Sequence, residues 1–308
     1  MQNNNIKRKG IILAGGIGSR LAPITNAVSK QLLLVYDKPM IFYPLSTLML
    51  AGIKDILLIT KKEDLLSFER LLGDGSQLGI NIKFAIQENP DGLAQSFIIG
   101  EAFLDNSPVV LILGDNLFHG SHFINQLEKA NSNPNKNTIF AYPVKDPSRY
   151  GVVEFESDGK VIDIAEKPLK PKSKYAVTGL YFFDNSITEK AKKVKSSKRG
   201  ELEITSINQM YLAEKNLDVE LMGRGMAWFD TGTFDSLQQA SSYIRTLEKR
   251  QGLKIGCPEE VAWRKGWIGE TKLKQIGDKF NNSPYGSYLL DILEDQKNNI
   301  PSRIETFS

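Results

Sequence analysis

Two basic residues and a glycine-rich turn are the first candidates for chemistry in this sequence. An apolar run ends in the turn AGGIGSRL at positions 14–21, whose glycines lack a β-carbon and let backbone N–H groups approach a phosphate closely. Arg20 lies in this turn, and Lys30 follows on an irregular segment. A guanidinium can bind a polyphosphate through two parallel hydrogen bonds, and a lysine adds a positive charge. The pattern predicts a phosphate site, although each residue taken alone is equally well a turn or surface residue.

Two aspartates are the second set of candidates. Asp115 comes just after the apolar run Val109–Leu113, and Asp230 lies between aromatic residues and a glycine turn. Magnesium is usually held by one or two carboxylates together with substrate phosphate oxygens, so two aspartates suffice for such a site. Taken singly, Asp115 is equally well a turn cap and Asp230 the cap of the following helix. Together with the basic residues, they favour phosphoryl chemistry, which depends on positioning and charge compensation more than on proton transfer.

Other chemistries lack a residue that they need. A dinucleotide-binding turn would have a third glycine where Leu21 stands, and Pro23 interrupts the helix that should follow. The two histidines, His119 and His122, lie close together without a second cluster that would complete a zinc site. No Gly-x-Ser-x-Gly motif is present, and Cys257 is far from either histidine in the sequence. Hydride transfer and nucleophilic hydrolysis are therefore disfavoured.

The elements that must position these residues follow from apolar periodicity. Five apolar runs read as buried strands: Gly10–Ala14, Asp55–Thr60, Ile82–Ile86, Val109–Leu113 and Thr138–Tyr142. Amphipathic stretches separate most of them, which predicts an α/β fold with a Rossmann-like, mostly parallel sheet flanked by helices. A helix is expected over Met40–Ala51, with Pro39 at its start and Gly52 just past its end. Ligands of such sheets bind beyond the carboxyl ends of the strands, where the charged candidates lie.

The pattern of apolar runs and turn residues changes after Gly151, where antiparallel strands are expected. The expected elements are a hairpin of 152–155 and 160–164, a strand at 175–183, a helix at 201–215, a strand at 218–222 and a helix at 234–250. The chain beyond Gln251 reads as helical and less regular. We therefore expect one α/β domain over 1–252, with parts at about 1–145 and 146–252, and a helical C-terminal region over 253–308.

Composition limits the classes of partner. The chain has 308 residues, 41% of them hydrophobic and 24% charged, which suits one large α/β domain with a small appendage. A net charge of +3 is too small to predict a nucleic-acid or membrane surface. The single cysteine cannot form an intramolecular disulfide, and no apolar signal segment precedes the first strand. A cytoplasmic protein that binds neither nucleic acid nor membrane is expected.

Several motifs, taken together, resemble a known family. The segments Leu13–Leu21 and Ser29–Leu33 resemble the nucleotidylyltransferase signature. Further segments are similar, in order, to the bacterial glucose-1-phosphate thymidylyltransferases: 37–41, 90–95, 114–116, 149–155, 166–168 and 199–205. The match spans Lys9 to about Leu293.

The sequence departs from the family pattern at two positions. Leu34 replaces the usual proline, which is expected to loosen the loop that carries Lys30, and Ser19 replaces threonine but keeps the hydroxyl. The segments before Lys7 and from Lys297 fall outside the pattern and are candidates for disorder.

The resemblance implies transfer of a deoxythymidylyl group from dTTP to α-D-glucose 1-phosphate, giving dTDP-glucose and pyrophosphate, with Mg²⁺ as cofactor. This is the first step of dTDP-rhamnose-type deoxysugar synthesis. The catalytic residues implied are Arg20, Lys30 and Lys167, and the metal ligands are Asp115 and Asp230. The nucleotide-binding residues implied are Gly15, Gly16, Gly18, Ser19, Arg20, Lys30, Gln31, Gln87, Gly92 and Asp115, with Gln87 and Gly92 at the thymine. The sugar-phosphate residues implied are Asn116, Tyr150, Gly151, Glu166, Lys167, Val177 and Arg199.

The resemblance assigns the nucleotide to the part at 1–145 and the sugar phosphate to the part at 146–252. It also implies a homotetramer with a second, regulatory nucleotide site at which dTDP-rhamnose inhibits. The residues implied there are Gly120, His122, Arg224, Glu260 and Arg264, which from sequence alone are equally well surface and helix-end charges.

A uridylyltransferase or another sugar-1-phosphate nucleotidylyltransferase is the alternative, because fold does not fix substrate. A regulatory homologue without turnover is disfavoured by the intact charged residues.

Overall fold

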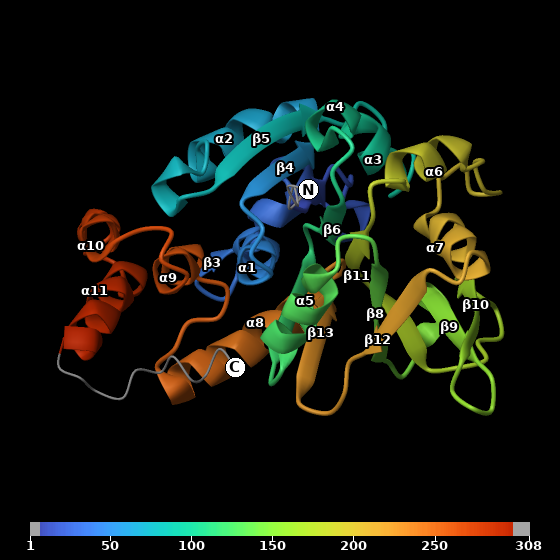
Figure 1. The fold of residues 1–308 in the computed structure, drawn as a ribbon. Coiled ribbons are helices and arrows are strands. Elements are labelled where there is room, and N and C mark those ends of the chain that lie inside the picture. Colours follow the sequence, from blue (N-terminus) through green and yellow to red (C-terminus); the bar gives the residue numbers. More distant parts are fainter. Residues whose placement is uncertain (1–6, 298–308) are drawn as a thin grey trace, which may run out of the picture.

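A nine-stranded mixed sheet forms the centre of the chain, which the computed structural model describes over residues 7–297 (Figure 1). Residues 1–6 and 298–308, on which most of the disorder expectation falls, lie outside the described residues. Along the main path of the sheet the strand order is β10-β9-β11-β6-β1-β4-β5, and β8 and β12 extend it from β11.

One half of the sheet is parallel and carries helices on its faces. Its strands are β1 (Lys9–Ala14), β4 (Asp55–Thr60), β5 (Asn81–Ile86) and β6 (Val109–Leu113). Its helices are α1 (Phe42–Leu50), α2 (Leu65–Leu72), α3 (Gln95–Ile99), α4 (Glu101–Leu104) and α5 (Phe123–Ser132). Neighbouring residues of β1 belong to different cores, Ile11 to one face and Ile12 to the other, because strand side chains alternate. Burial on both faces explains the continuous apolar runs.

The other half of the sheet is largely antiparallel and begins at β11 (Tyr175–Phe183), which runs antiparallel to β6. Its further strands are β8 (Asn137–Pro143), β9 (Gly151–Phe155), β10 (Val161–Glu166) and β12 (Leu217–Leu221), and its helices are α6 (Ile187–Lys193) and α7 (Ile204–Ala213). The run at 138–142 was expected to join the parallel set. Instead, β8 pairs antiparallel with β11 and parallel with β12.

Two small sheets were not expected. One pairs β7 (Asn116–Gly120) with β13 (Met226–Asp230), and the other pairs β2 (Leu34–Val35) with β3 (Lys38–Pro39). The expectation that Pro39 opens a helix is wrong, because this proline lies in β3 and α1 begins at Phe42. The helix still has a proline near its start, at Pro44, where the backbone N–H would lack an intrahelical partner in any case.

The remaining helices close the chain. They are α8 (Phe234–Gln251), α9 (Pro258–Arg264), α10 (Glu270–Lys279) and α11 (Pro284–Lys297). Figure 1 shows α9 beside α1, with α10 and α11 beyond it at one end of the molecule, and β9, β10 and α7 at the other end. A division at about residue 252 into separate units stays a prediction. Within residues 7–297, the helices are too short or too polar to cross a membrane.

Candidate active site

The glycine-rich turn lies where β1 ends, at the carboxyl edge of the parallel strands. Gly18 has a left-handed conformation (φ 67°) and leads into a 3₁₀ turn over Ser19–Leu21. A β-carbon added to Gly15 would lie 2.2 Å from Oε1 of Gln87, whereas one added to Gly16 would meet nothing within 4 Å. Gly15 is therefore required by close packing, and Gly16 faces open space from which a ligand can approach.

Lys30 and Asp115 form an ion pair just beyond the strands. Lys30 lies in a 3₁₀ turn over Lys30–Leu32, and its Nζ is 2.5 Å from Oδ2 of Asp115, which follows β6 and Gly114. Burial alone would raise the pKa of Asp115, but the Lys30 ammonium and a hydrogen bond from Asn116 hold this pKa below its ordinary value. Asp115 is therefore kept ionised despite its burial.

Asp230 lies close to Asp115 although the two are far apart in the sequence. Pairing of β7 with β13 sets Asp230 opposite Asn116, and the hydroxyl and N–H of Thr231 donate to the backbone oxygen of Asp115 at 2.7 and 3.1 Å. Burial, and then the neighbouring Asp115 carboxylate, raise the pKa of Asp230. Asp230 is not the cap of the next helix, because Thr233 caps α8 through a capping box with Ser236.

Arg20 reaches the same place from the glycine-rich turn. A β-carbon added to Gly232 would lie 2.7 Å from Nη2 of Arg20 and 2.9 Å from Oδ1 of Asp230, so both side chains border this glycine. Arg20, Lys30, Asp115 and Asp230 thus converge from four segments of the chain.

Asn116 orients this group. Its Nδ2 donates to Asp115 at 3.0 Å, while its Oδ1 accepts from the N–H of Gly179 at 3.0 Å and from Nε1 of Trp228 at 2.6 Å. Because both acceptor positions of this buried amide oxygen are used inside the protein, Asn116 fixes the Asp115 carboxylate. Its contact with a sugar phosphate stays a prediction.

The two aspartates are the candidate metal ligands. No group of three or more histidine, cysteine, aspartate or glutamate side chains that could hold a metal occurs within residues 7–297. Two convergent carboxylates, one of which raises the pKa of the other, are nevertheless a donor set that suits a hard divalent cation with substrate oxygens as its other ligands. The residues present therefore fit Mg²⁺.

Of the residues expected to hold the nucleoside, Gln87 packs against Gly15 of the glycine-rich turn. Gln87 directly follows β5 and is 4% exposed, and its N–H donates to the backbone oxygen of Thr60 at 2.8 Å. Gly92 has φ 111°, and an added β-carbon would lie 2.5 Å from the backbone of Leu202. Gln31 is buried against Gly114 and accepts a hydrogen bond from Ser29 at 2.8 Å.

The residues expected at the sugar phosphate gather around β9, β10 and α7. Glu166 accepts from the Thr205 hydroxyl at 2.5 Å and lies 3.7 Å from both Lys167 and Arg199. Gly151 lies against this group, because an added β-carbon would be 3.3 Å from Thr205, 3.6 Å from Glu166 and 3.7 Å from Val177. Lys167 has a left-handed backbone (φ 43°), which is strained for a residue with a side chain. This strained conformation occurs beside an exposed charged cluster.

Tyr150 joins the two groups of charged residues. Its backbone oxygen accepts from the N–H of Lys167 at 3.0 Å, and its ring centroid lies 5.2 Å from that of Trp228. Burial, and then the Asp230 carboxylate, raise the pKa of Tyr150, so the phenol lies close enough to feel that charge. The sugar-phosphate candidates and the acidic candidates therefore border one continuous region.

Sequence reasoning gave no role to four residues that the structure brings to this region. They are Arg149, Thr205, Trp228 and Gln95. Arg149 lowers the pKa of Asp230, which burial and Asp115 raise. Arg149, Thr205 and Gln95 all lie inside motifs that carry the family resemblance, so the motif boundaries were the available signal. Trp228 lacked such a signal, because its role depends on the pairing of β13 with β7.

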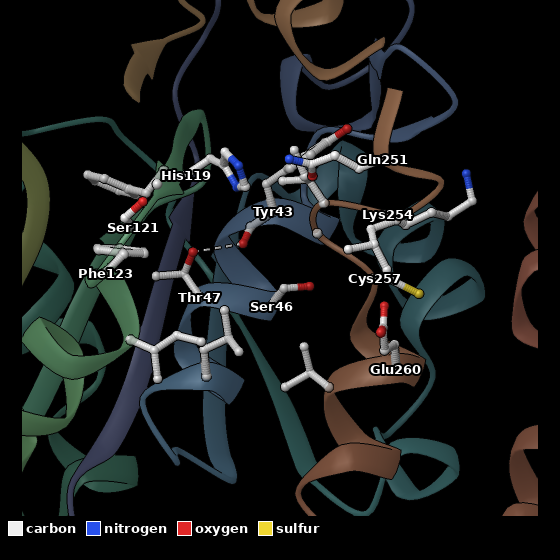
Figure 2. A pocket seen from close by; sticks show the side chains of 18 of the residues that line it. Tyr43, Ser46, Thr47, His119, Ser121, Phe123, Gln251, Lys254, Cys257 and Glu260 are labelled. Carbon is white, nitrogen blue, oxygen red and sulfur yellow. Dashed lines mark hydrogen bonds between the residues drawn. The ribbon is translucent and has the colours of Figure 1, made fainter. Parts of the chain in front are cut away.

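A second opening lies between α1, β7 and the linker from α8 to α9, with a volume of about 570 Å³ (Figure 2). Of the residues expected at a regulatory site, Gly120, His122 and Glu260 line it. Arg264 pairs with Glu260 at 2.8 Å, and the turn that carries Arg224 abuts Gly120, where an added β-carbon would be 2.4 Å from the backbone oxygen of Gly225. The structure therefore places three of the five residues on the lining of this opening, Arg264 against one of them, and Arg224 next to the Gly225 that abuts Gly120.

Comparison with known proteins finds relatives that match most of this chain. The family model described as nucleotidyl transferase matches residues 9–246. A glucose-1-phosphate thymidylyltransferase of Neisseria meningitidis is 56% identical over 286 residues, covering 93% of this chain and 99% of the relative. A crystal structure from Bacillus anthracis, assigned as a glucose-1-phosphate thymidylyltransferase and in complex with sucrose, is 40% identical, with a TM-score of 0.71 and coverage of 77% of this chain and 95% of that one.

A more distant similarity concerns the fold alone. A UDP-glucose pyrophosphorylase complexed with UDP-glucose has a TM-score of 0.69 at 24% identity and covers 78% of this chain and 99% of that one. The identity and coverage of the Neisseria relative, by contrast, are far above what shared fold requires. The chain belongs to the nucleotidyl transferase family and, within it, to the glucose-1-phosphate thymidylyltransferases.

Proposed function

We propose that this protein transfers a deoxythymidylyl group from dTTP to α-D-glucose 1-phosphate and releases pyrophosphate. A phosphate oxygen of the sugar phosphate forms a bond to the α-phosphorus, and the bond from that phosphorus to the oxygen bridging to the β-phosphorus breaks in line. The observation that carries the proposal is the convergence of Arg20, Lys30, Asp115 and Asp230 at the carboxyl edge of the parallel strands. The identity to named thymidylyltransferases supports the choice of substrates.

The nucleotide would bind along the glycine-rich turn. Backbone N–H groups from Gly15 to Arg20 would cradle the triphosphate, with the guanidinium of Arg20 and the ammonium of Lys30 facing its negative charge. Gln87 and Gly92 would hold the base, and Gln31 would help to position the nucleoside. Close packing of Gly15 on Gln87 supports this assignment, because it brings the phosphate turn and the base residue into contact.

The sugar phosphate would bind on the far side of Tyr150. Glu166 would accept hydrogen bonds from sugar hydroxyls, while Lys167 and Arg199 would meet the phosphate. Both cations already lie 3.7 Å from Glu166, so their charges are held close to it without a direct hydrogen bond. Gly151 and Val177 complete this wall.

No general base is needed, because a sugar phosphate is already an anion at neutral pH. The work of these residues is to align the two reactants and to compensate charge as it moves toward pyrophosphate. Asp115 and Asp230 would hold Mg²⁺, which when bound would supply positive charge at the phosphate oxygens. Lys30 keeps Asp115 ionised and ready for that role.

We further propose that the protein works in the cytoplasm as a homotetramer, at the entry to dTDP-rhamnose-type synthesis. The second opening would be the regulatory site for the end product. The convergence of Gly120, His122 and Glu260 on its lining supports this assignment. Light scattering would test the tetramer, and equilibrium binding of dTDP-rhamnose would test the regulatory site.

The activity is tested by pyrophosphate release from purified protein with a panel of dTTP, UTP, dCTP and ATP against glucose, galactose and mannose 1-phosphates. The proposal expects the highest kcat/KM for dTTP with glucose 1-phosphate, and none without a divalent cation. A higher value for UTP would make the protein a uridylyltransferase of the same fold. No turnover of any pair would favour a regulatory homologue.

A further inference from the structure

We propose that Gln95 and Asp91 determine which atom Gln87 presents to the base, and thereby make the site select a pyrimidine that carries a hydrogen on ring nitrogen N3. This inference rests on the proposed function, in which Gln87 reads the base. It adds two positioning residues to which the comparison and the motifs assign no role.

Three side chains form a chain of hydrogen bonds that leads from the protein surface to the base pocket. Nε2 of Gln95 donates to Oδ2 of Asp91 at 2.9 Å, and Oε1 of Gln95 accepts from Nε2 of Gln87 at 2.6 Å. The backbone N–H of Asp91 also donates to Oε1 of Gln95 at 3.3 Å. Gln95 is the first residue of α3, one helical turn after Asp91.

The direction of this chain is set by two groups that cannot change their hydrogen-bonding role. An ionised carboxylate only accepts, and a backbone N–H only donates. The Asp91 carboxylate therefore requires the amide nitrogen of Gln95 on its side, and the Asp91 N–H requires the amide oxygen. Both constraints select the same orientation of Gln95, which leaves its oxygen facing Gln87.

The orientation of Gln87 follows from that of Gln95. Because Oε1 of Gln95 is an acceptor, Gln87 must turn its nitrogen toward it and its own oxygen the other way. That oxygen lies against Gly15 and accepts no hydrogen bond from the residues that the structure describes. Gln87 is 4% exposed, so the amide has little room to rotate. The amide oxygen of Gln87 is thus a hydrogen-bond acceptor of fixed orientation in the base pocket.

The carboxylate end of the chain is itself held in place. The N–H of Leu202 donates to the backbone oxygen of Asp91 at 2.6 Å, and the N–H of Ala94 donates to the backbone oxygen of Leu202 at 3.1 Å. Gly92, between them, packs directly on the Leu202 backbone. Asp91 therefore belongs to a braced loop even though its side chain is exposed.

A fixed acceptor distinguishes pyrimidines by the proton on N3. Thymine and uracil carry a hydrogen there and can donate to Gln87, whereas cytosine has a lone pair that would face the glutamine oxygen. A site committed to one hydrogen-bonding pattern rejects the wrong partner, because its buried polar atom is then left unpaired. If Gln87 were free to rotate, it could serve both kinds of base.

The test compares dTTP with 5-methyl-dCTP, which shares the methyl group, the deoxyribose and the triphosphate and differs only at positions 3 and 4 of the ring. The readout is the ratio of kcat/KM for the two nucleotides, because a ratio cancels differences in folded fraction. The variants are Gln95→Met, which keeps the length and removes all three hydrogen bonds of the Gln95 side chain, Asp91→Asn, Gln87→Met and the double variant of Gln87 and Gln95. Gln238→Met, which removes an exposed glutamine on α8 that donates to Ser242, is the matched control.

We expect Gln95→Met to lower the dTTP preference at least about tenfold, partly by raising turnover of 5-methyl-dCTP, and Asp91→Asn to lower it less, because the backbone N–H still orients Gln95. The double variant should match Gln87→Met, since Gln95 acts through Gln87. An unchanged ratio in Gln95→Met, with a changed ratio in Gln87→Met, would overturn the inference alone. An unchanged ratio in both would remove Gln87 from the base site and overturn the assignment beneath it. If Gln95→Met does not fold, the exposed Asp91→Lys decides, because an ammonium only donates and competes for the Gln95 oxygen that faces Gln87; an unchanged ratio there counts against the inference.

Discussion

The segment from Lys30 to Lys38 contributes to two groups of lysine and carboxylate side chains that differ in how fully they are paired. In the first group, Lys30 meets Asp115 beside Asp230. In the second, Lys38 is 1% exposed and lies 2.6 Å from Asp37 and 2.8 Å from Glu248. Lys254 completes the second group by contacting both of these carboxylates, and the N–H of Ile255 donates to Glu248 at 2.9 Å.

The aspartates of the two groups are shifted in opposite directions. Burial opposes ionisation of Asp37, yet Lys38 and Lys254 hold its pKa below the ordinary value. Burial and Asp115 instead raise the pKa of Asp230, and within residues 7–297 Asp230 makes no salt bridge of its own. Each carboxylate of the second group is thus paired with a lysine, while Asp230 of the first group is left available for a ligand. An unpaired carboxylate, rather than charge as such, marks the candidate site.

The largest expected effect falls on turnover in the first group. Asp115→Asn and Asp230→Asn should each fold but lose about 100- to 1,000-fold in kcat, because each removes half of the negative charge meant for one cation. The double variant should lose little more, as expected for residues that act as a unit. Pyrophosphate release against magnesium concentration, beside thermal unfolding, measures this. Near-normal turnover with either asparagine would remove that aspartate from the metal site.

A comparably strong effect, on stability, is expected in the second group. Lys38→Met leaves buried carboxylates short of a cation and should destabilise the fold by about 3–5 kcal/mol, while the folded fraction retains most of its kcat. Lys136→Met is the control, because its pair with Asp218 is more than half exposed on both sides and should contribute about 0–1 kcal/mol. Urea unfolding and kcat at low temperature report the two quantities. A large loss of kcat with little loss of stability would erase the contrast between the groups.

A smaller effect is expected at the thymine methyl. The acceptor proposed at the base pocket is the amide oxygen of Gln87. The N3 hydrogen of thymine and that of uracil would bond to it equally well. We therefore expect dTTP to be preferred over dUTP by less than about 200-fold, the range for one methyl group. UTP, measured alongside, separates the contribution of the deoxyribose. A preference far above this range would require a further polar feature.

The smallest expected effect concerns the second opening. Arg264 is paired with Glu260 there, as the lysines of the second group are paired, whereas the side chain of Arg224 is exposed. Replacing both with glutamine should raise the concentration of dTDP-rhamnose that halves turnover by roughly 5- to 150-fold. The measurement is inhibition of pyrophosphate release at fixed substrate. Unchanged inhibition would show that these arginines are not part of a regulatory site.

Much of the fold could be predicted, because its strands are long and buried on both faces. The strands at 55–60, 109–113 and 175–183 have the predicted bounds, and the helix predicted at 234–250 is one residue longer. The sheet of β7 and β13 could not be found, because its strands lie more than 100 residues apart and neither has a long apolar run. The antiparallel pairing of β8 with β11 could not be predicted either, because β8 follows the parallel strands in the sequence and was expected to join them.

The candidate site was harder to predict from the sequence, because a residue type does not reveal whether its charge or its hydrogen-bonding atoms are paired inside the protein. Lys30 and Lys38 look alike in the sequence, yet only Lys30 lies in the first group, beside Asp115 and Asp230. For Asn116 the sequence predicted contact with substrate, which stays a prediction, but it did not predict that the amide oxygen accepts hydrogen bonds from Gly179 and Trp228. The motif at 90–95 includes Gln95 but does not reveal a role for it, since its three hydrogen bonds to Gln87 and Asp91 form only in the folded chain.

The two hydrogen bonds between Leu202 and the loop at 91–94 have a consequence for how this enzyme can change over evolution. They fasten the segment that carries Arg199 and Glu203 to the loop that carries Gly92, so under the proposed function the sugar site and the base site would share one piece of backbone. A mutation that moved Leu202 to admit a different sugar would then also shift the loop proposed to lie beside the base. We therefore expect substitutions near Leu202 that broaden the range of sugars to relax the choice of nucleotide as well, so that new donor and acceptor preferences arise together in laboratory selections.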